Sequence, residues 1–79
     1  MCDFACGLSR TLSGQLIPSE RREHMIMETW NPLGLVGVIS AFNFPHAVFG
    51  WNLCLALITG NAVIWKGSQY TGLVTMATN

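Results

Sequence analysis

The chain has 79 residues, of which 51% are hydrophobic and only 10% are charged, and its formal net charge is zero. Typical soluble domains carry about 25% charged residues, so this chain is too apolar for its size to cover its own faces. It therefore either lies in a membrane or forms part of something larger. The four basic residues are scattered along the chain, which argues against a nucleic-acid partner.

The membrane alternative draws support from one window, because no charged residue occurs between Glu28 and Lys66. A spanning helix needs about 20 predominantly apolar residues in a row, and asparagines, prolines and a glycine divide this window into short segments. We therefore expect no membrane span, and the start of the chain does not have the composition of a signal peptide. Three cysteines without a CxxC pair favour a reducing compartment, cytoplasmic or mitochondrial.

Residues 1–13 predict the end of an amphipathic helix. Their apolar side chains recur at helical spacing, at Phe4, Ala5, Leu8 and Leu12. Met1 offers no capping side chain, so we expect the first half of this helix to be missing. Gly14 is expected to end the helix, because glycine is common just after a helix.

Residues 14–32 predict a β-hairpin. Its strands are expected at residues 15–17 and 24–30, and the densely charged segment 18–23 joins them. An isolated hairpin is marginally stable in water. We therefore expect this one to pair with something outside the chain.

Residues 33–79 predict a right-handed parallel βαβ unit. A buried strand at 35–41 precedes a helix at 45–58 that is apolar nearly all round and should be covered on most sides. A second short buried strand follows at 62–65, and a further helix starts near residue 70. Ligands of such α/β sheets bind at the carboxyl ends of the strands.

Asn43 is the first candidate site residue, because it is a polar amide at the turn between the first strand and the helix that Pro45 opens. Its NH₂ group can donate two hydrogen bonds without carrying charge, so it could hold an oxygen that becomes negative during a reaction. The alternative is that Asn43 only caps the following helix. Spacing alone leaves both interpretations open.

Lys66 is the second candidate, since it ends a buried strand at the same sheet edge as Asn43. A lone cation there could hold a ribose hydroxyl or a phosphate, or it could simply extend out of an apolar neighbourhood.

Aromatic residues and cysteines add further candidates. Phe44 and Trp51 could line a ligand tunnel, although such aromatics more often belong to the core. Cys54 has no histidine or carboxylate close in sequence and predicts a buried, inert thiol. His46 is most simply a packed or partly exposed histidine. No cysteine or histidine has the spacing of metal ligands, so we expect no metal. The turn after the first buried strand also lacks the GxGxxG fingerprint of ordinary dinucleotide-binding units.

Several motifs in order resemble a known family. At Asn43-Phe44-Pro45, Gly60-Asn61 and Trp65-Lys66 the chain resembles the aldehyde dehydrogenase superfamily. Other blocks look like its antiquitin branch, namely Cys2-Asp3, Gly7-Leu8-Ser9-Arg10, Pro18-Ser19-Glu20-Arg21, Trp30-Asn31-Pro32, Ala41-Phe42-Asn43-Phe44-Pro45, Gly50-Trp51-Asn52 and Trp65-Lys66-Gly67. The similarity covers nearly all the chain. It implies an α/β fragment of a much longer enzyme, with part of the oligomerisation hairpin and the first βαβ unit of a Rossmann-variant NAD domain that lacks GxGxxG.

The resemblance also implies roles for individual residues. Asn43 matches the residue that stabilises the thiohemiacetal oxygen in the transition state, and Lys66 matches the lysine that holds the adenosine ribose of NAD. Ser40, Ala41 and Phe42 match the segment whose backbone lies along the coenzyme. Phe44 and Trp51 match aromatic walls of the aldehyde tunnel.

The chain departs from the family pattern at a few positions. Phe42 stands where many relatives have tryptophan, in agreement with the antiquitin branch. Gln69 stands where many have a glutamate that helps to grip the ribose, which bears on the choice between NAD and NADP. His46 stands where an apolar residue is expected. The catalytic cysteine, the general-base glutamate and the glycine-rich phosphate segment of the family are expected beyond Asn79, and none of the cysteines present matches the nucleophile.

The expected function is that of part of an NAD-dependent aldehyde dehydrogenase. The whole enzyme would oxidise an aldehyde, α-aminoadipic semialdehyde in lysine catabolism, to a carboxylate, and would assemble as a homotetramer. These 79 residues alone are predicted to be inactive. The alternatives are a short, inert product that only associates with parent subunits through its hairpin, and a small membrane-associated protein.

Overall fold

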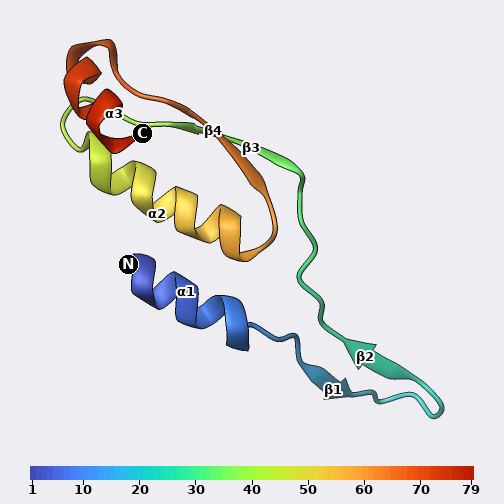
Figure 1. Ribbon diagram of the computed structural model, residues 1–79. Coiled ribbons are helices and arrows are strands. Elements are labelled where there is room, and N and C mark those ends of the chain that lie inside the picture. The colour runs from blue at the N-terminus through green and yellow to red at the C-terminus, as the bar shows by residue number, and fades with distance from the viewer.

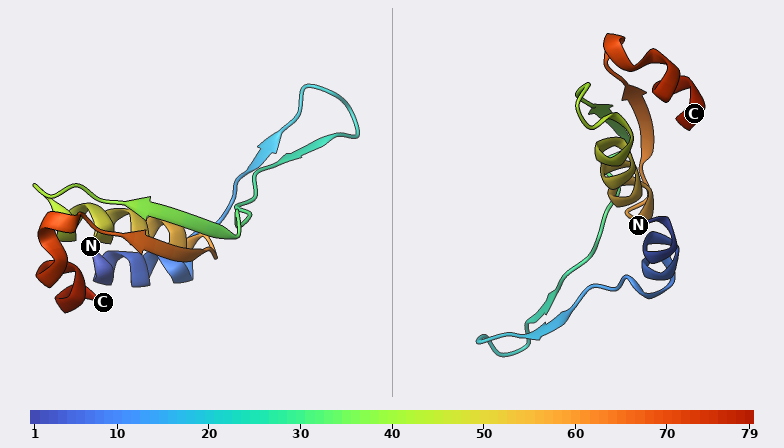
Figure 2. Two further views of the ribbon diagram at one scale, coloured as in Figure 1. Left: turned by 90° about the horizontal axis from the view of Figure 1, so that it is seen from above. Right: turned by 90° about the vertical axis from the view of Figure 1, so that its left-hand side faces the viewer.

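The computed structural model describes all residues from Met1 to Asn79, and Figure 1 shows the order of the elements. They are α1 (Cys2–Thr11), β1 (Leu16–Pro18), β2 (Met25–Met27), β3 (Leu35–Ile39), α2 (Pro45–Ile58), β4 (Ala62–Lys66), the 3-10 helix η1 (Gln69–Thr71) and α3 (Gly72–Thr78). The β1–β2 hairpin extends away from a body formed by the other elements (Figures 1 and 2). The order of elements agrees with the prediction, with strand and helix ends differing by a few residues.

The body is built on the predicted parallel pair of strands. β3 pairs with β4 in a register that runs from Leu35 opposite Ala62 to Ile39 opposite Lys66. The helix α2 connects the two strands and packs against both. Both strands therefore end at the same edge of the sheet, as the sequence predicted.

Only one face of the β3–β4 pair is covered. Side chains alternate along a strand, so neighbouring residues lie on opposite faces. Val38 and Ser40 are buried, with 5% and 4% of their surface exposed, whereas Leu35 and Ile39 are 64% and 78% exposed. The prediction of buried strands is thus wrong for one face of each strand, because α2 covers a single side of the pair. For the same reason the apolar helix α2 keeps exposed side chains, such as that of Leu55.

α1 runs alongside α2 (Figure 2). Three of the four predicted apolar residues are shielded, since Ala5 is buried and Leu8 and Leu12 are half-buried, whereas Phe4 is 67% exposed. Ala5 is the buried residue of α1, and Cys2 and Cys6 line the same hollow between the two helices. Small side chains let the helices approach closely, which explains why this face is preferred over the one that carries Phe4.

Gly14 has a different role from the one predicted. α1 ends at Thr11, and Leu12 is already extended at φ −62° and ψ 114°. A Cβ at Gly14 would collide with the backbone carbonyl of Glu28. Glycine is therefore needed where the two ends of the hairpin approach each other, next to the hydrogen bond of 2.8 Å from the Glu28 N–H to the Gln15 carbonyl.

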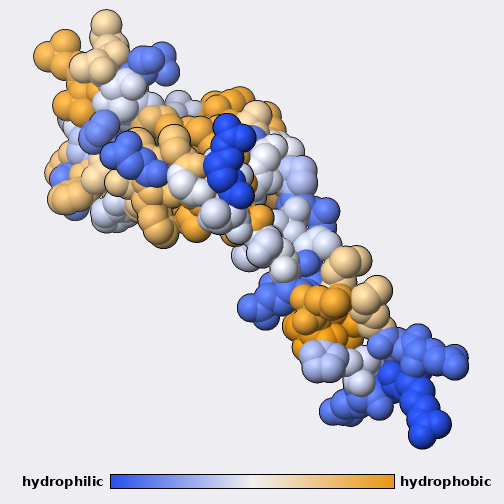
Figure 3. Space-filling model, turned by 60° about the horizontal axis from the view of Figure 1, so that its bottom comes forward, coloured by the Kyte–Doolittle hydropathy of each residue, from blue (hydrophilic) through white to orange (hydrophobic).

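The hairpin is short and fully exposed. β1 and β2 are antiparallel with Ile17 opposite Ile26, and every residue of both strands is exposed. The predicted second strand at 24–30 is longer than the observed one. Figure 3 shows an apolar cluster on the hairpin between hydrophilic residues, and further apolar areas over the body.

The whole chain is extended for its length. A compact domain of 79 residues has a radius of gyration of about 12 Å, whereas this chain has 17.2 Å. Its accessible surface of 6572 Å² exceeds the roughly 4,700 Å² of a folded monomer of its mass, and only 6 of 79 residues are buried. None of its helices combines the length and the apolar character that crossing a membrane would need.

We expect residues 1–79, expressed alone, to show no cooperative unfolding transition. The uncovered sheet face and the hairpin leave more apolar surface exposed than isolated soluble proteins tolerate. The product should be insoluble or molten, and differential scanning calorimetry with near-ultraviolet circular dichroism tests this. A soluble monomer with a sharp thermal transition would contradict the expectation.

Candidate functional site

Two adjacent chain segments follow the carboxyl ends of the parallel strands. Residues 40–44 connect β3 to α2, and residues 67–68 connect β4 to η1. Because β3 and β4 are direct neighbours, these segments start side by side. This edge is where ligands of parallel α/β sheets bind, and all but one of the predicted site residues lie on or next to these segments.

Ser40 is held at the start of the first segment. Its backbone N–H donates to the carbonyl of Lys66 at 3.2 Å, which continues the ladder by one residue beyond β3. Its Oγ accepts a hydrogen bond of 2.9 Å from Nε1 of Trp65. Ser40 is therefore fixed by backbone and side chain at once, and its N–H is already used within the chain.

Aromatic contacts add to these links. The rings of Phe49 in α2 and Trp65 in β4 are stacked, with centroids 3.9 Å apart and planes 11° apart. Phe42 meets Tyr70 of η1 edge-to-face at 6.2 Å. The Phe49–Trp65 contact thus fixes the end of β4 against α2, and the Phe42–Tyr70 contact joins the segment after β3 to η1.

Asn43 does not cap α2. The N-cap position is taken by Phe44, no side chain makes a capping hydrogen bond, and Pro45 occupies the first turn. Asn43 is exposed, and none of the side-chain hydrogen bonds of the chain involves its amide. The capping interpretation is therefore wrong, whereas an amide available to a ligand agrees with this geometry.

Lys66 is the last residue of β4 and is exposed. It lies on the face of the strand opposite to that of Trp65, since successive side chains alternate. Gly67 follows it in close contact with α3, because a Cβ there would collide with Oγ1 of Thr75. That oxygen is itself held, since Oγ1 donates to the carbonyl of Thr71 at 3.0 Å. The carbonyl of Lys66 is therefore bonded to Ser40, and the next residue lies in close contact with α3.

Phe44 and Trp51 lie near each other at the start of α2, with ring centroids 6.2 Å apart. They are 54% and 48% exposed, so neither ring belongs to the core of this chain. His46 is exposed as well, and its Nδ1 lies 3.1 Å from Oγ1 of Thr78 in α3. Because that hydroxyl donates to the carbonyl of Val74, Nδ1 of His46 is the donor in this bond.

Asn61 is a residue whose role sequence analysis missed. It is 7% exposed, and its Oδ1 accepts from the backbone N–H groups of Leu33 at 2.5 Å and Gly34 at 2.8 Å. Its Nδ2 donates to the carbonyl of Ala56 and to Oγ1 of Thr59. The amide thus joins the end of α2 to the turn before β3. A polar residue directly after a helix-ending glycine was the available signal.

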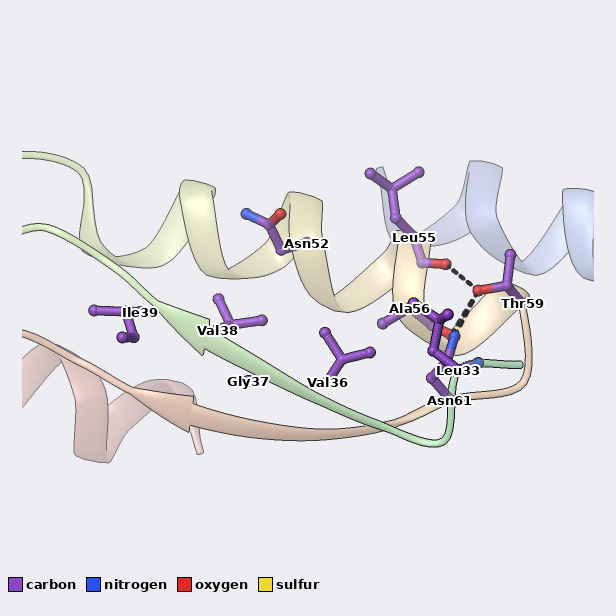
Figure 4. Close-up of a pocket in the computed structure, with 10 residues that line it drawn as sticks. All are labelled: Leu33, Val36, Gly37, Val38, Ile39, Asn52, Leu55, Ala56, Thr59 and Asn61. Carbon is purple, nitrogen blue, oxygen red and sulfur yellow. Dashed lines mark hydrogen bonds between the residues drawn. The ribbon is translucent and has the colours of Figure 1, made fainter. Parts of the chain in front are cut away.

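An open hollow of about 460 Å³ runs along β3 beneath α2 (Figure 4). Residues of both elements line it, among them Val36, Val38 and Leu55, with Asn61 at one end. None of the predicted site residues lines this hollow. It runs along the strand as far as Ile39 and stops short of the segments that carry the predicted residues, so it is not the candidate site.

Cys54 behaves as the sequence predicted. It is buried in α2, and burial raises the pKa of its thiol, as does the neighbouring thiol of Cys2. A raised pKa keeps the thiol protonated at neutral pH, and a protonated thiol is a poor nucleophile. Cys54 is therefore not a catalytic cysteine.

Comparison with solved structures identifies the class of fold. A structure described as 3,6-anhydro-L-galactose dehydrogenase in complex with NAP matches with a TM-score of 0.76 and 33% sequence identity. The match covers 96% of this chain and 16% of that one. The chain thus has the α/β fold of one part of that dehydrogenase, in agreement with the predicted fold class.

Sequence comparison identifies the family. The model of the aldehyde dehydrogenase family matches residues 1–78, so the chain belongs to this family. Aldehyde dehydrogenase family 7 member A1 of Malus domestica is 68% identical over 77 residues, and alpha-aminoadipic semialdehyde dehydrogenase of Rattus norvegicus is 62% identical over 77 residues. These matches cover 98% of this chain but only 15% and 14% of the two relatives. The resemblance to the antiquitin branch is confirmed.

Proposed function

We propose that this chain is one segment of an NAD-dependent aldehyde dehydrogenase that oxidises α-aminoadipic semialdehyde to the carboxylate. The observation that carries the proposal is the exposed amide of Asn43, which caps no helix and lies in the segment after β3, the strand whose end pairs with Lys66. The names of the similar proteins support the reaction type and the semialdehyde. The overall reaction consumes the aldehyde, water and NAD⁺ and yields the carboxylate, NADH and two protons.

The donor set at the strand ends fits a dinucleotide. Lys66 offers an ammonium with three donors, and the exposed residues 41–43 lie outside any helix or strand. Lys66 would hold the adenosine ribose, and the backbone of residues 40–42 would lie along the coenzyme. Because the backbone N–H of Ser40 is bonded to Lys66, the carbonyl is the one backbone group of Ser40 left to contact the coenzyme. Bound NAD would supply the acceptor for the hydride.

The choice of NAD over NADP rests on the resemblance to the antiquitin branch, not on the structural relative, which binds NAP. Gln69 opens η1 directly after the segment that follows Lys66. An uncharged amide there would not repel the additional phosphate of NADP, and it would hold the adenosine ribose less firmly than a carboxylate would. Gln69 therefore does not by itself decide between the two coenzymes. We propose NAD as the preferred coenzyme.

Asn43 would act on the aldehyde. When a cysteine outside this chain adds to the carbonyl, the oxygen becomes negative, and the Nδ2 group of Asn43 would donate a hydrogen bond to it. A hydrogen-bond donor at the position of this oxygen stabilises the negative charge that develops on it. Phe44 and Trp51 would form part of the wall of the aldehyde tunnel.

Assembly and location complete the proposal. The exposed β1–β2 hairpin offers unpaired strand edges and apolar side chains, which suits an oligomerisation contact in a homotetramer. We also propose a cytoplasmic or mitochondrial location, which the unpaired cysteines favour, and a role in lysine catabolism, which the proposed substrate implies. The exposed hairpin also favours a second candidate function, that of an inert short form that associates with parent subunits.

The proposed function is tested with the full-length protein that carries this chain. We expect it to form NADH with α-aminoadipic semialdehyde, more slowly with hexanal, which lacks the amino and carboxyl groups, and more slowly still when NADP replaces NAD. Absorbance of the reduced coenzyme and mass-spectrometric detection of the carboxylate measure this. Failure to reduce either coenzyme with any aldehyde would contradict the proposal and favour the inert form.

A further inference from the structure

The contact between Trp65 and Ser40 crosses from one strand end to the other. An indole N–H can only donate, so Ser40 Oγ is the acceptor in the 2.9 Å bond. Ser40 is 4% exposed, and Trp65 is half-buried, so water competes little for this bond. It is the one side-chain hydrogen bond that joins β4 to the segment after β3.

The indole is itself fixed from α2. Phe49 stacks on Trp65 with the rings 3.9 Å apart and nearly parallel. The ring therefore cannot turn away from Ser40 without losing this contact. A continuous path runs from the helix through the indole to the serine hydroxyl, beneath the carboxyl edge of the sheet.

The two ends of this contact adjoin candidate site residues. Trp65 directly precedes Lys66, and Ser40 directly precedes residues 41–43. The backbone bond from the Ser40 N–H to the Lys66 carbonyl is, at 3.2 Å, at the long end for an N–H···O bond, and it holds the first residue of the segment after β3. The side-chain bond adds a second restraint at a different point, and two restraints fix an orientation that one does not.

We propose that Trp65 and Ser40 are positioning residues that hold residues 41–43 and Lys66 at the spacing one coenzyme molecule requires. This inference rests on the proposed function and extends it to two residues that do not donate to the ligand through their side chains. Without the bond, the segment after β3 would keep only the Ser40 backbone bond and the Phe42–Tyr70 contact, and it would move more in the absence of coenzyme. Binding would then have to order it, which weakens affinity but restores the site once the coenzyme is bound.

Two single variants and their combination test the inference in the full-length enzyme. Trp65→Phe keeps an aromatic ring over Phe49 and removes the N–H, and Ser40→Ala removes the acceptor. We expect each to raise the Kd for NAD, measured by calorimetry, by about fivefold, the loss of roughly one hydrogen bond. The double variant should match the single ones in Kd, and kcat of Trp65→Phe at saturating NAD should change less than about twofold. Ser9→Ala, an exposed serine of α1, is the control.

A measurement without coenzyme separates this inference from the proposed function. Hydrogen–deuterium exchange of the peptide that covers residues 40–44 should be faster in both single variants than in the wild type or Ser9→Ala. Lower melting temperature with unchanged exchange and unchanged Kd would show a merely structural role and overturn the inference. So would additive Kd effects in the double variant. Wild-type protein without affinity for NAD would contradict the proposed function. The hydrogen–deuterium exchange of residues 40–44 in the variants would then be the measurement that decides whether Trp65 and Ser40 hold this segment.

Discussion

Asn43→Ala in the full-length enzyme is expected to lower kcat by about 10²- to 10³-fold, the usual loss for one oxyanion donor. The amide caps no helix and is exposed, so its removal should change the free energy of unfolding by less than about 0.5 kcal/mol. Steady-state NADH formation at saturating substrates, together with thermal unfolding, measures both quantities.

Asn52→Ala is the matched control for this variant. Asn52 is an exposed asparagine of α2, and its Nδ2 donates only to the carbonyl of Val48 in the same helix, at 2.8 Å. It should keep nearly full kcat. If Asn43→Ala and Asn52→Ala had the same kcat, the proposed role of Asn43 would be untenable.

Lys66→Ala is expected to weaken NAD binding by about tenfold to a hundredfold, with a much smaller effect on the chemical step at saturating NAD. A charge-assisted hydrogen bond contributes about 1.5 to 3 kcal/mol, which converts to this range of affinity. Lys66 is exposed at the end of β4, so its truncation should leave the fold intact. Calorimetric titration with NAD is the measurement.

Two further variants sharpen the test of Lys66. Lys66→Arg keeps the charge and should recover part of the affinity, whereas Arg10→Ala removes an exposed charge from α1 and should leave affinity unchanged. Equal NAD affinity in wild type and Lys66→Ala would support the alternative that this lysine only extends out of an apolar neighbourhood.

Local sequence signals determined the order of the elements. Val38 and Ile39 are β-branched and lie in a strand, and Pro45 sits in the first turn of α2. The parallel pairing followed because a helix separates two short apolar runs. The burial of the strands could not be predicted in the same way. An apolar run indicates that both faces of a strand are suited to burial, but it does not say whether this chain contains the residues that cover them. Ile39 is suited to a buried face that nothing in this chain covers.

The candidate site was predictable in part. Asn43 and Lys66 stood out as polar residues at the ends of apolar runs, and the structure places both segments at one edge of the sheet. The bond between Trp65 and Ser40 was not predictable, since it joins residues far apart in sequence whose types suggest ordinary core and strand roles. The role of Asn61 was not predictable either, because it accepts hydrogen bonds from Leu33 and Gly34, which lie far from it in the sequence, in the turn before β3.

The central claim, that Asn43 donates to a developing negative oxygen, is tested most directly by Asn43→Asp in single-turnover NADH formation by the full-length enzyme. The carboxylate is close in size to the amide and is favoured near the start of α2, so the melting temperature should be retained. It offers no donor and repels a negative oxygen. We expect a stable variant that binds NAD normally and forms NADH at least about 10²-fold more slowly than the wild type. A stable Asn43→Asp variant that forms NADH at the wild-type rate would contradict the account.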